Sequence, residues 1–275
     1  MLPEVATRVS EHVYAMVGWP NVAIVVGDRG TLVVDAGLGP KTGAVIERVA
    51  RRLAKGPVLY LTTTHFHPEH AGGEPGFSAG TILIRNTVQQ EEMRTDGAAL
   101  MERFKGFSEE YQQALEGVNL REPDILFEKE LKLDLGGVTA RLMWITGGHT
   151  RGDMMTFVEG DATLISGDIV ESKLVPAAGG DTASIKGWLE ILDRVEALKP
   201  KWVVPDHGDL GDGSLVGKER AFLVDLRDAA VGLKRQGVSV EDAGVRVTEV
   251  LKGKYPDWPN LGGVAGVVRR VYSEY

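Results

Sequence analysis

The sequence predicts an α/β fold that ends in a helical extension, and three observations support this prediction. Short Val-rich segments bounded by Gly, Pro and Asp alternate with segments whose apolar residues recur at helical spacing. From about residue 215 onward only the helical pattern continues. With 275 residues, 43% of them hydrophobic, the chain can bury a substantial core. We therefore predict one main domain over residues 1–215 and a C-terminal helical extension over residues 216–275 that packs on the same domain.

The first half of the main domain begins with strands. Three Val-rich segments separated by turn residues predict a meander of strands over residues 13–18, 21–28 and 31–37. Apolar residues at helical spacing predict a helix over residues 41–54, and a strand over residues 58–64 follows it. Residues 86–120 are polar with scattered large apolar side chains, which favours helices that cover one edge of the domain.

The second half again mixes strands and helices. Residues 124–135 and 138–145 are predicted as strands that flank a Gly-Gly turn, and residues 154–168 as a hairpin. A helix over residues 185–195 and a short strand over residues 201–205 complete the domain.

The extension shows two helical signals. Four apolar residues form one stripe at helical spacing: Phe222, Leu223, Leu226 and Ala230. Ser239 and Asp242 resemble a capping box that begins another helix. We expect this extension to pack against the core, and a homodimer contact through it is the alternative.

Composition excludes several classes of partner and site. A formal charge of -8 and the lack of any basic run longer than a pair argue against nucleic acid. No apolar stretch approaches the roughly 20 residues that a membrane span needs. Without cysteine there is no disulfide and no thiolate ligand. The compartment stays unknown: the chain as it stands is typical of a cytoplasmic protein, and a signal peptide removed earlier would make it an exported one.

Three of the six histidines in the chain lie within six positions, in the stretch THFHPEHAGG. If His65 and His67 continue the preceding strand, their side chains project to the same side, because strand side chains alternate. Pro68 suits the first position of a helix, so Glu69 and His70 would lie in its first turn and face the two strand histidines. Four potential metal ligands are thereby gathered at one strand-to-helix turn.

Other potential ligands occupy comparable places farther along the chain. His149 in WITGGHTRGD, Asp168 in TLISGDIV and His207 in VVPDHGD each follow a predicted strand. A lone histidine at such a place is more often a hydrogen-bonded loop residue than a ligand. Five of six histidines at strand ends, however, predict a metal site, and imidazole and carboxylate ligands suit zinc. We expect one or two zinc ions per chain, with iron or manganese as alternatives.

These residues resemble the signature of the metallo-β-lactamase superfamily, H-x-H-x-D-H, which reads HFHPEH in this chain. The segments GGHT, SGD and PDHG follow in the order of the family, so the resemblance covers about residues 10–215. It implies a four-layer αββα sandwich with the metals at one edge of the two sheets.

The resemblance also implies a role for each ligand. His65, His67 and His149 would hold a first metal, while His70 and His207 would hold a second one. Asp168 would bridge the two metals. Asp35, in VVDAG, matches a family aspartate that orients a ligand histidine from behind.

Glu69 departs from the family signature, which has Asp at that place. Its extra methylene moves the carboxylate and puts binding of a second metal in doubt, so a single zinc is an alternative to a dinuclear site. Glu69 as a metal ligand also competes with a simpler interpretation, in which it is an acidic residue favoured at a helix N-terminus.

The expected chemistry is hydrolysis. A zinc-bound water has a pKa of about 7, so a metal-bound hydroxide can attack a polarised carbonyl at neutral pH. Glu69 and Asp168 are the candidate catalytic residues that orient this water or pass on its proton. We predict a metallo-β-lactamase-like hydrolase of a small molecule that contains a lactam, lactone, ester or thioester.

The sequence says little about the substrate. Trp19, in an early loop, could form an apolar flap, although simple packing is the commoner role of such an aromatic. Arg151 and Lys173 lie near ligand positions in the sequence and could bind a substrate carboxylate, with solvated surface charge as the alternative. The absence of cysteine excludes the subclass of β-lactamases that uses a Cys ligand.

Two rival functions share these ligands. One is an iron-dependent oxidoreductase on the same fold, similar to persulfide dioxygenases. The other is a non-catalytic metal-binding protein. Metal analysis separates the first from a zinc hydrolase, and chelator-sensitive turnover separates the second.

Overall fold

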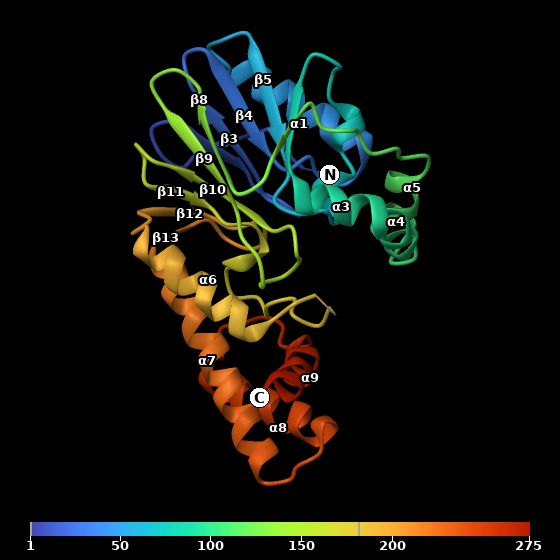
Figure 1. The fold of residues 1–275 in the computed structure, drawn as a ribbon, viewed down its shortest axis with the longest axis vertical. Coiled ribbons are helices and arrows are strands. Elements are labelled where there is room, and N and C mark those ends of the chain that lie inside the picture. The colour runs from blue at the N-terminus through green and yellow to red at the C-terminus, as the bar shows by residue number, and fades with distance from the viewer. Residues whose placement is uncertain (1, 181) are drawn as a thin grey trace.

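The computed structural model describes residues 2–180 and 182–275 and shows two sheets packed face to face (Figure 1). Within these residues the first sheet has seven strands, in the order β1-β2-β3-β4-β5-β6-β7. Its strands are β1 (Thr7–Arg8), β2 (Val13–Met16), β3 (Val22–Val26), β4 (Gly30–Val34), β5 (Val58–Thr62), β6 (Ile82–Asn86) and β7 (Ile125–Phe127). Strands β1 to β4 are antiparallel, and β4 to β7 are parallel.

The second sheet has six described strands in the order β13-β12-β11-β10-β9-β8. They are β8 (Glu130–Asp134), β9 (Thr139–Trp144), β10 (Met154–Val158), β11 (Thr163–Ile165), β12 (Trp202–Val204) and β13 (Gly211–Asp212). Strands β8 to β11 are antiparallel neighbours, and β12 runs parallel to β11. Strands β9, β11 and β12 therefore point in one direction, and their carboxyl ends lie at the same edge.

Helices cover the outer face of each sheet. On the first sheet they are α1 (Gly39–Leu53), α2 (Pro68–Ala71), α3 (Thr87–Thr95), α4 (Gly97–Lys105) and α5 (Glu109–Leu115). On the side of the second sheet they are α6 (Ile185–Ala197), α7 (Ser214–Arg235), α8 (Val240–Lys254) and α9 (Val264–Glu274). One apolar cluster lies between the sheets, a second joins α1 to the first sheet, and a third joins α6 and α7 to the second. The expected αββα sandwich with a C-terminal helical extension is confirmed.

Two local predictions were wrong. Residues 124–135 were predicted as one strand, but the chain breaks at residues 128–129, so that β7 joins the first sheet and β8 the second. The strand predicted over residues 58–64 ends at Thr62. Beyond that point the backbone N–H of Thr64 donates to the Asp35 carboxylate (2.7 Å) instead of to a neighbouring strand. His65 and His67 therefore lie in a loop and not in a strand.

The extension forms a narrower body at one end of the molecule (Figure 1). The Phe222 ring stacks on the Trp258 ring, with centroids 4.0 Å apart. Ser239 caps α8, since its side chain accepts a hydrogen bond from the N–H of Asp242 at 3.2 Å. The predicted boundary between residues 215 and 216 falls in the first turn of α7.

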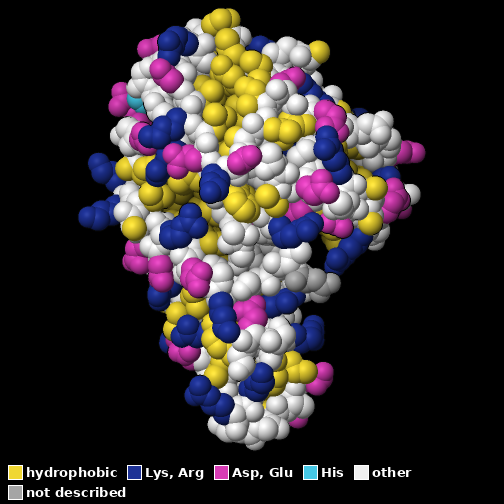
Figure 2. All heavy atoms as spheres, in the orientation of Figure 1, with side chains coloured by type: hydrophobic (Ala, Val, Ile, Leu, Met, Phe, Trp, Pro, Cys, Tyr) yellow, Lys and Arg dark blue, Asp and Glu magenta, His cyan; other side chains and the backbone are white. Residues whose placement is uncertain are grey.

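The outer surface shown in Figure 2 carries basic and acidic side chains interspersed, over both the sandwich and the extension. Across the described residues, none of the helices combines the length and the apolar character that crossing a membrane requires.

Candidate metal centre

The three clustered histidines lie in the loop and short helix that follow β5. Thr64 fixes this loop, because its backbone N–H donates to Asp35 and its hydroxyl donates to Asp206 Oδ2 at 2.8 Å. Pro68 occupies the first turn of α2, as predicted. Gly73 lets the following segment approach the chain after β4 closely, since a Cβ there would lie 1.9 Å from the Ala36 carbonyl oxygen.

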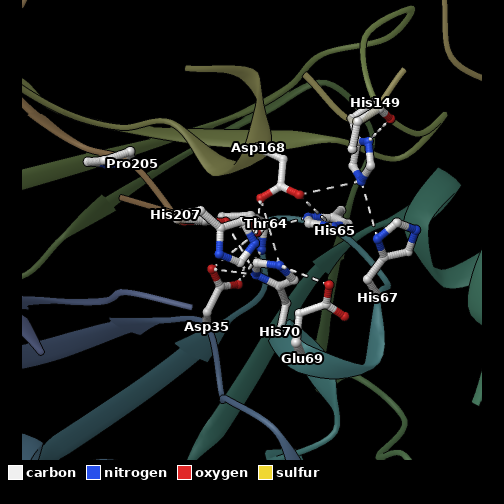
Figure 3. A network of polar contacts seen from close by, with 12 residues as sticks. Asp35, Thr64, His65, His67, Glu69, His70, His149, Asp168, Pro205 and His207 are labelled. Atoms are coloured by element: carbon white, nitrogen blue, oxygen red, sulfur yellow. Dashed lines mark hydrogen bonds and ion pairs between the residues drawn. The ribbon is translucent and has the colours of Figure 1, made fainter. Parts of the chain in front are cut away.

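The remaining ligands reach the same place from the second sheet. His149 lies in the loop between β9 and β10, Asp168 in the 3-10 turn η2 (Gly167–Ile169) after β11, and His207 directly after β12. Because the carboxyl ends of β9, β11 and β12 meet at one edge, these three side chains converge on the α2 loop (Figure 3).

His65, His67 and His149 form the first group around Asp168. His67 Nδ1 lies 3.2 Å from His149 Nε2. Asp168 Oδ2 lies 3.8 Å from His65 Nε2 and 3.5 Å from His149 Nε2. The ligand atoms of the three histidines lie within 4.8 Å of one another, so a single cation can contact all of them. We call this the first metal position.

His70 and His207 form a second group on the other oxygen of the same aspartate. Asp168 Oδ1 lies 3.8 Å from His70 Nε2 and 3.4 Å from His207 Nε2. Glu69 Oε1 lies 3.9 Å from His70 Nε2. Figure 3 shows Asp168 between the two groups. We call the second group the second metal position, and Asp168 has one oxygen facing each position.

Several of the donor atoms fit a metal because they lack hydrogen-bond partners. Within the described residues, buried atoms without a hydrogen-bond partner include one ligand atom from each of four of these side chains: His65 Nε2, Glu69 Oε2, His70 Nε2 and Asp168 Oδ1. A buried polar atom without a partner costs about 1–3 kcal/mol. Several such atoms aimed at shared points are explained by cations that they coordinate, and imidazole with carboxylate suits zinc among other divalent ions.

Burial sets the protonation of most of these histidines. It lowers the pKa of His65 and of His67 well below the usual value, and neighbouring histidines act in the same direction. It also lowers the pKa of His149 to about 4 and that of His207 to about 3. All four imidazoles are therefore neutral at pH 7, which is the form that binds a metal.

His70 differs because two carboxylates support it. Burial alone would lower its pKa, but Asp35 and Asp206 raise the pKa well above the usual value. His70 Nδ1 lies 3.3 Å from Asp35 Oδ2 and 3.3 Å from Asp206 Oδ2. This pair fixes the ring so that Nε2 faces the second metal position. Asp35 thus lies where the sequence placed it, behind a ligand histidine.

A cavity of about 650 Å³ opens over the centre. Its wall combines the metal-facing residues with apolar side chains, among them Phe66, Leu100, Phe104, Phe107, Leu174 and Val175. Trp19, which is 57% exposed, stacks on the His207 ring at 3.8 Å and also lines the cavity. Arg103 is a basic residue of this wall. The cavity therefore offers an apolar surface next to polar groups.

The two basic residues proposed as substrate contacts lie elsewhere. Arg151 pairs with Glu92 (3.3 Å) and Asp96 (3.2 Å), and Lys173 pairs with Asp257 (2.9 Å). Neither residue is among those that line the cavity.

Sequence reasoning missed three residues near the centre. Asp206 supports His70, Arg103 lines the cavity, and Glu171 lies close to Asp168 and His207. Asp206 stands directly before His207, so its position at a strand end could have been predicted from the sequence. Glu171 follows Asp168 by three residues, but no pattern distinguishes it. Arg103 lies in a polar helical region that gave no signal at all.

Comparison with known proteins gives a family and several relatives. The family model described as "Metallo-beta-lactamase superfamily" matches residues 17–207, more than half of the chain. Among curated proteins, a "Linear primary-alkylsulfatase" from Pseudomonas sp. (strain ATCC 19151) is 22% identical, over 89% of this chain and 51% of that protein.

Solved structures agree on the fold. A metallo-beta-lactamase from Pontibacter korlensis superposes with a TM-score of 0.66 at 20% identity, covering 82% of this chain and 99% of the other. The stereoselective inverting sec-alkylsulfatase Pisa1 from Pseudomonas sp. superposes with a TM-score of 0.72 at 17% identity, covering 98% of this chain and 50% of the other. The chain thus spans about half the length of the alkylsulfatases that it matches.

Proposed function

This chain belongs to the metallo-beta-lactamase superfamily, and on that premise we propose that it is a zinc-dependent hydrolase. The bond cleaved is that of a lactam, lactone, ester or thioester in a small, partly apolar substrate. One observation supports the proposal above all others: five histidines from three segments of the chain gather beside Asp168, and the buried Nε2 atoms of His65 and His70 lack a hydrogen-bond partner among the described residues. A fold alone does not imply a function, whereas such a site limits the chemistry to that of a bound cation.

When bound, zinc lowers the pKa of a coordinated water towards 7 and polarises the carbonyl. The residues of this chain supply the rest. Glu69 can accept a hydrogen bond from the attacking water through Oε2, which has no other partner among the described residues. From the same place it can return the proton to the leaving group, which is general acid–base catalysis. Asp168 faces the first position with Oδ2 and the second position with Oδ1.

The cavity wall suggests how the substrate is held. Phe104 and Leu100 give it an apolar surface, and the Arg103 guanidinium has no ion pair or hydrogen bond with any described residue. In a chain of net charge -8, an arginine without an acidic partner beside a metal centre is suited to an anionic group of the substrate. We infer that the substrate carries a carboxylate or a comparable anion as well as an apolar part.

A sulfate ester is the second candidate substrate, for a specific reason. The alkylsulfatase structure covers 98% of this chain, including the helical extension, whereas the Pontibacter metallo-beta-lactamase covers 82%. An alkyl sulfate also joins an apolar chain to an anion, as the cavity and Arg103 would require.

A panel of substrates tests the proposal. Purified protein is analysed for zinc, iron and manganese and then assayed with a chromogenic cephalosporin, a lactone, a thioester, a carboxylic ester and an alkyl sulfate, with and without chelator. We expect chelator-sensitive hydrolysis of at least one carbonyl substrate. Turnover of the alkyl sulfate alone would replace the carbonyl proposal with the second candidate. Arg103→Leu should raise KM for anionic substrates about 10-fold or more and leave neutral esters unchanged.

Removal of two ligands tests the role of the metal. The double variant His65→Ala and His67→Ala should lose both zinc binding and turnover, because both residues face the first metal position. The matched control is His12→Ala, which removes the one histidine outside the centre; its ring contacts Asp161 at 2.8 Å. Full activity in the double variant would refute the mechanism.

A further inference from the structure

Glu171 is a buried acidic side chain beside the second metal position. It follows Asp168 by three residues, just after the 3-10 turn η2, and it is 6% exposed. Its carboxylate, an Asp168 oxygen and a His207 nitrogen all lie within 4.8 Å of one another. Glu171 also lines the cavity over the centre. Glu171 therefore lies beside Asp168 and His207, two of the residues around the second metal position.

The backbone holds Glu171 in this place. The N–H of Ser172 donates to the carbonyl oxygen of His207 at 3.3 Å, which ties the two segments together. Gly208 has a φ of +86°, and a Cβ there would lie 2.5 Å from the Ser172 carbonyl oxygen. Only glycine fits both the conformation and the close approach. The segment carrying Glu171 is thus fixed directly against the segment carrying a metal-facing histidine.

No other described group explains the burial of this carboxylate. The Glu171 side chain has no hydrogen bond or ion pair with any described residue, and the hydrogen bond between this residue and Glu219 comes from the Glu171 backbone. The nearest charged groups are acidic: Asp168 on one side and Glu219, from α7, on the other. Burying a carboxylate without a basic partner costs several kcal/mol or more. Acidic neighbours add repulsion, so a cation is the partner that this arrangement lacks.

We propose that Glu171 is a further ligand of the cation held by His70 and His207, so that the second metal position is richer in carboxylate oxygens than the first. This inference rests on the metal binding proposed above and not on the substrate. The first position has three imidazoles and one shared aspartate oxygen. The second has two imidazoles, the other oxygen of that aspartate, Glu69 and Glu171. Oxygen ligands in larger number favour harder cations, such as Mn²⁺, relative to Zn²⁺.

Metal titration of the full chain tests this proposal without any assay of turnover. Metal-free protein is titrated with Zn²⁺ and with Mn²⁺ in competition with a chromophoric chelator. Wild type should bind two cations and show a smaller preference for Zn²⁺ over Mn²⁺ at the second position. Glu171→Gln should retain the first Zn²⁺. It should lower the affinity of the second position for Mn²⁺ at least about 10-fold, which is the smallest loss expected when even a residue that only supports a metal ligand is removed.

The matched control is Glu219→Gln, which removes a carboxyl group of equal size that is 1% exposed and belongs to no candidate ligand group of the described chain. It should bind both cations as wild type does. Equal losses in the two variants would overturn the proposal, because they would reflect buried charge and not coordination. Wild-type Mn²⁺ affinity in Glu171→Gln, or a wild type that binds one cation only, would overturn it as well.

Two further measurements keep the test decisive. If Glu171→Gln fails to fold, Glu171→Asp retains the carboxylate and should retain part of the Mn²⁺ affinity; a complete loss there would count against coordination. With Co²⁺ as probe, visible absorption strengthens as coordination number falls, so the second ion should absorb less than the first in wild type and more in the Gln variant. Unchanged absorption would contradict the proposal. A chain that binds metal as described but hydrolyses nothing would refute the proposed function alone.

Discussion

The edge of the sandwich and the C-terminal extension bury opposite kinds of side chain. At the edge, buried nitrogen and oxygen atoms of His65, His70 and Asp168 face one another without partners among the described residues. In the extension, the fully buried side chains are apolar, as at Phe222 and Val268, with Glu219 as an exception. If the edge binds metal as proposed, its unpartnered polar atoms lower the stability of the metal-free fold, and the apolar clusters supply stability that offsets this cost.

The largest expected effect of a single substitution lies in the extension. Phe222→Ala removes a ring that is 0% exposed and stacked on Trp258, so the free energy of unfolding should fall by about 3–5 kcal/mol. Zinc bound per folded chain should not change, because the ring has no part in the centre. Urea denaturation and metal analysis measure both quantities. As control, Val245→Ala, at a position that is 66% exposed, should cost little. If folded Phe222→Ala protein lost zinc, the extension would affect metal binding as well as stability, and the two regions would not be independent.

Acid should lower the free energy of unfolding of the metal-free protein, because the histidines at the edge are buried. The pKa of His149 is about 4 in the folded chain and about 6.5 when unfolded. Between these values the unfolded chain binds more protons, so the stability of metal-free protein falls as pH decreases from 6.5 towards 4. One such group contributes about 1.4 kcal/mol per pH unit, or roughly 3 kcal/mol in all. His149→Gln should reduce this slope, and Phe222→Ala should keep it. Urea denaturation at pH 4.5 to 7 measures the free energy of unfolding of each protein. If its dependence on pH is the same in His149→Gln as in wild type, His149 is not the group responsible.

The same contrast explains what the sequence could predict. His149 and His207 were found because each follows a strand whose pattern is local, and parallel strands bring their ends to one edge. The alternating sheet and helix layers were predicted from the same kind of local pattern. Arg151 was proposed for the substrate because it lies near His149 in the sequence, yet it pairs with Glu92 and Asp96 from α3 and the turn after it. Such partners depend on how distant elements dock, which no local pattern records.

Glu171 and Asp206 make the same point within the centre. Asp206 stands in the segment PDHG and Glu171 in no recognisable motif, and the contacts of both become visible only when the ends of β11 and β12 are placed side by side. The sequence therefore pointed to five imidazoles and to one carboxylate, Asp35, that lie together in the structure, while Glu171 and the contact of Asp206 with His70 became apparent only in the three-dimensional arrangement.

Asp206→Asn should have a smaller effect, greatest on one side of the centre. The carboxylate lies 3.3 Å from His70 Nδ1, and its loss should weaken the second metal by about 10- to 100-fold, or roughly 1.4–2.8 kcal/mol. The first metal should be weakened less, because Asp206 forms no ion pair with its three histidines among the described residues and reaches His65 only through the Thr64 hydroxyl. Competition titration with a chelating dye measures both affinities. Equal weakening of both metals would show that the two positions cannot be separated.

The smallest expected change in stability tests most strictly whether the extension and the metal centre are independent. Ser239→Ala removes the hydroxyl that accepts the N–H of Asp242 at the start of α8, which should lower stability by about 1 kcal/mol. Ser239→Asp, which can cap the same helix, should restore it. Because the cap acts only on α8, both variants should bind zinc and Mn²⁺ as wild type does. Any change in metal affinity with Ser239→Ala would mean that the extension transmits strain to the edge, and Glu219, which reaches from α7 to the neighbourhood of Glu171, would be the route to examine.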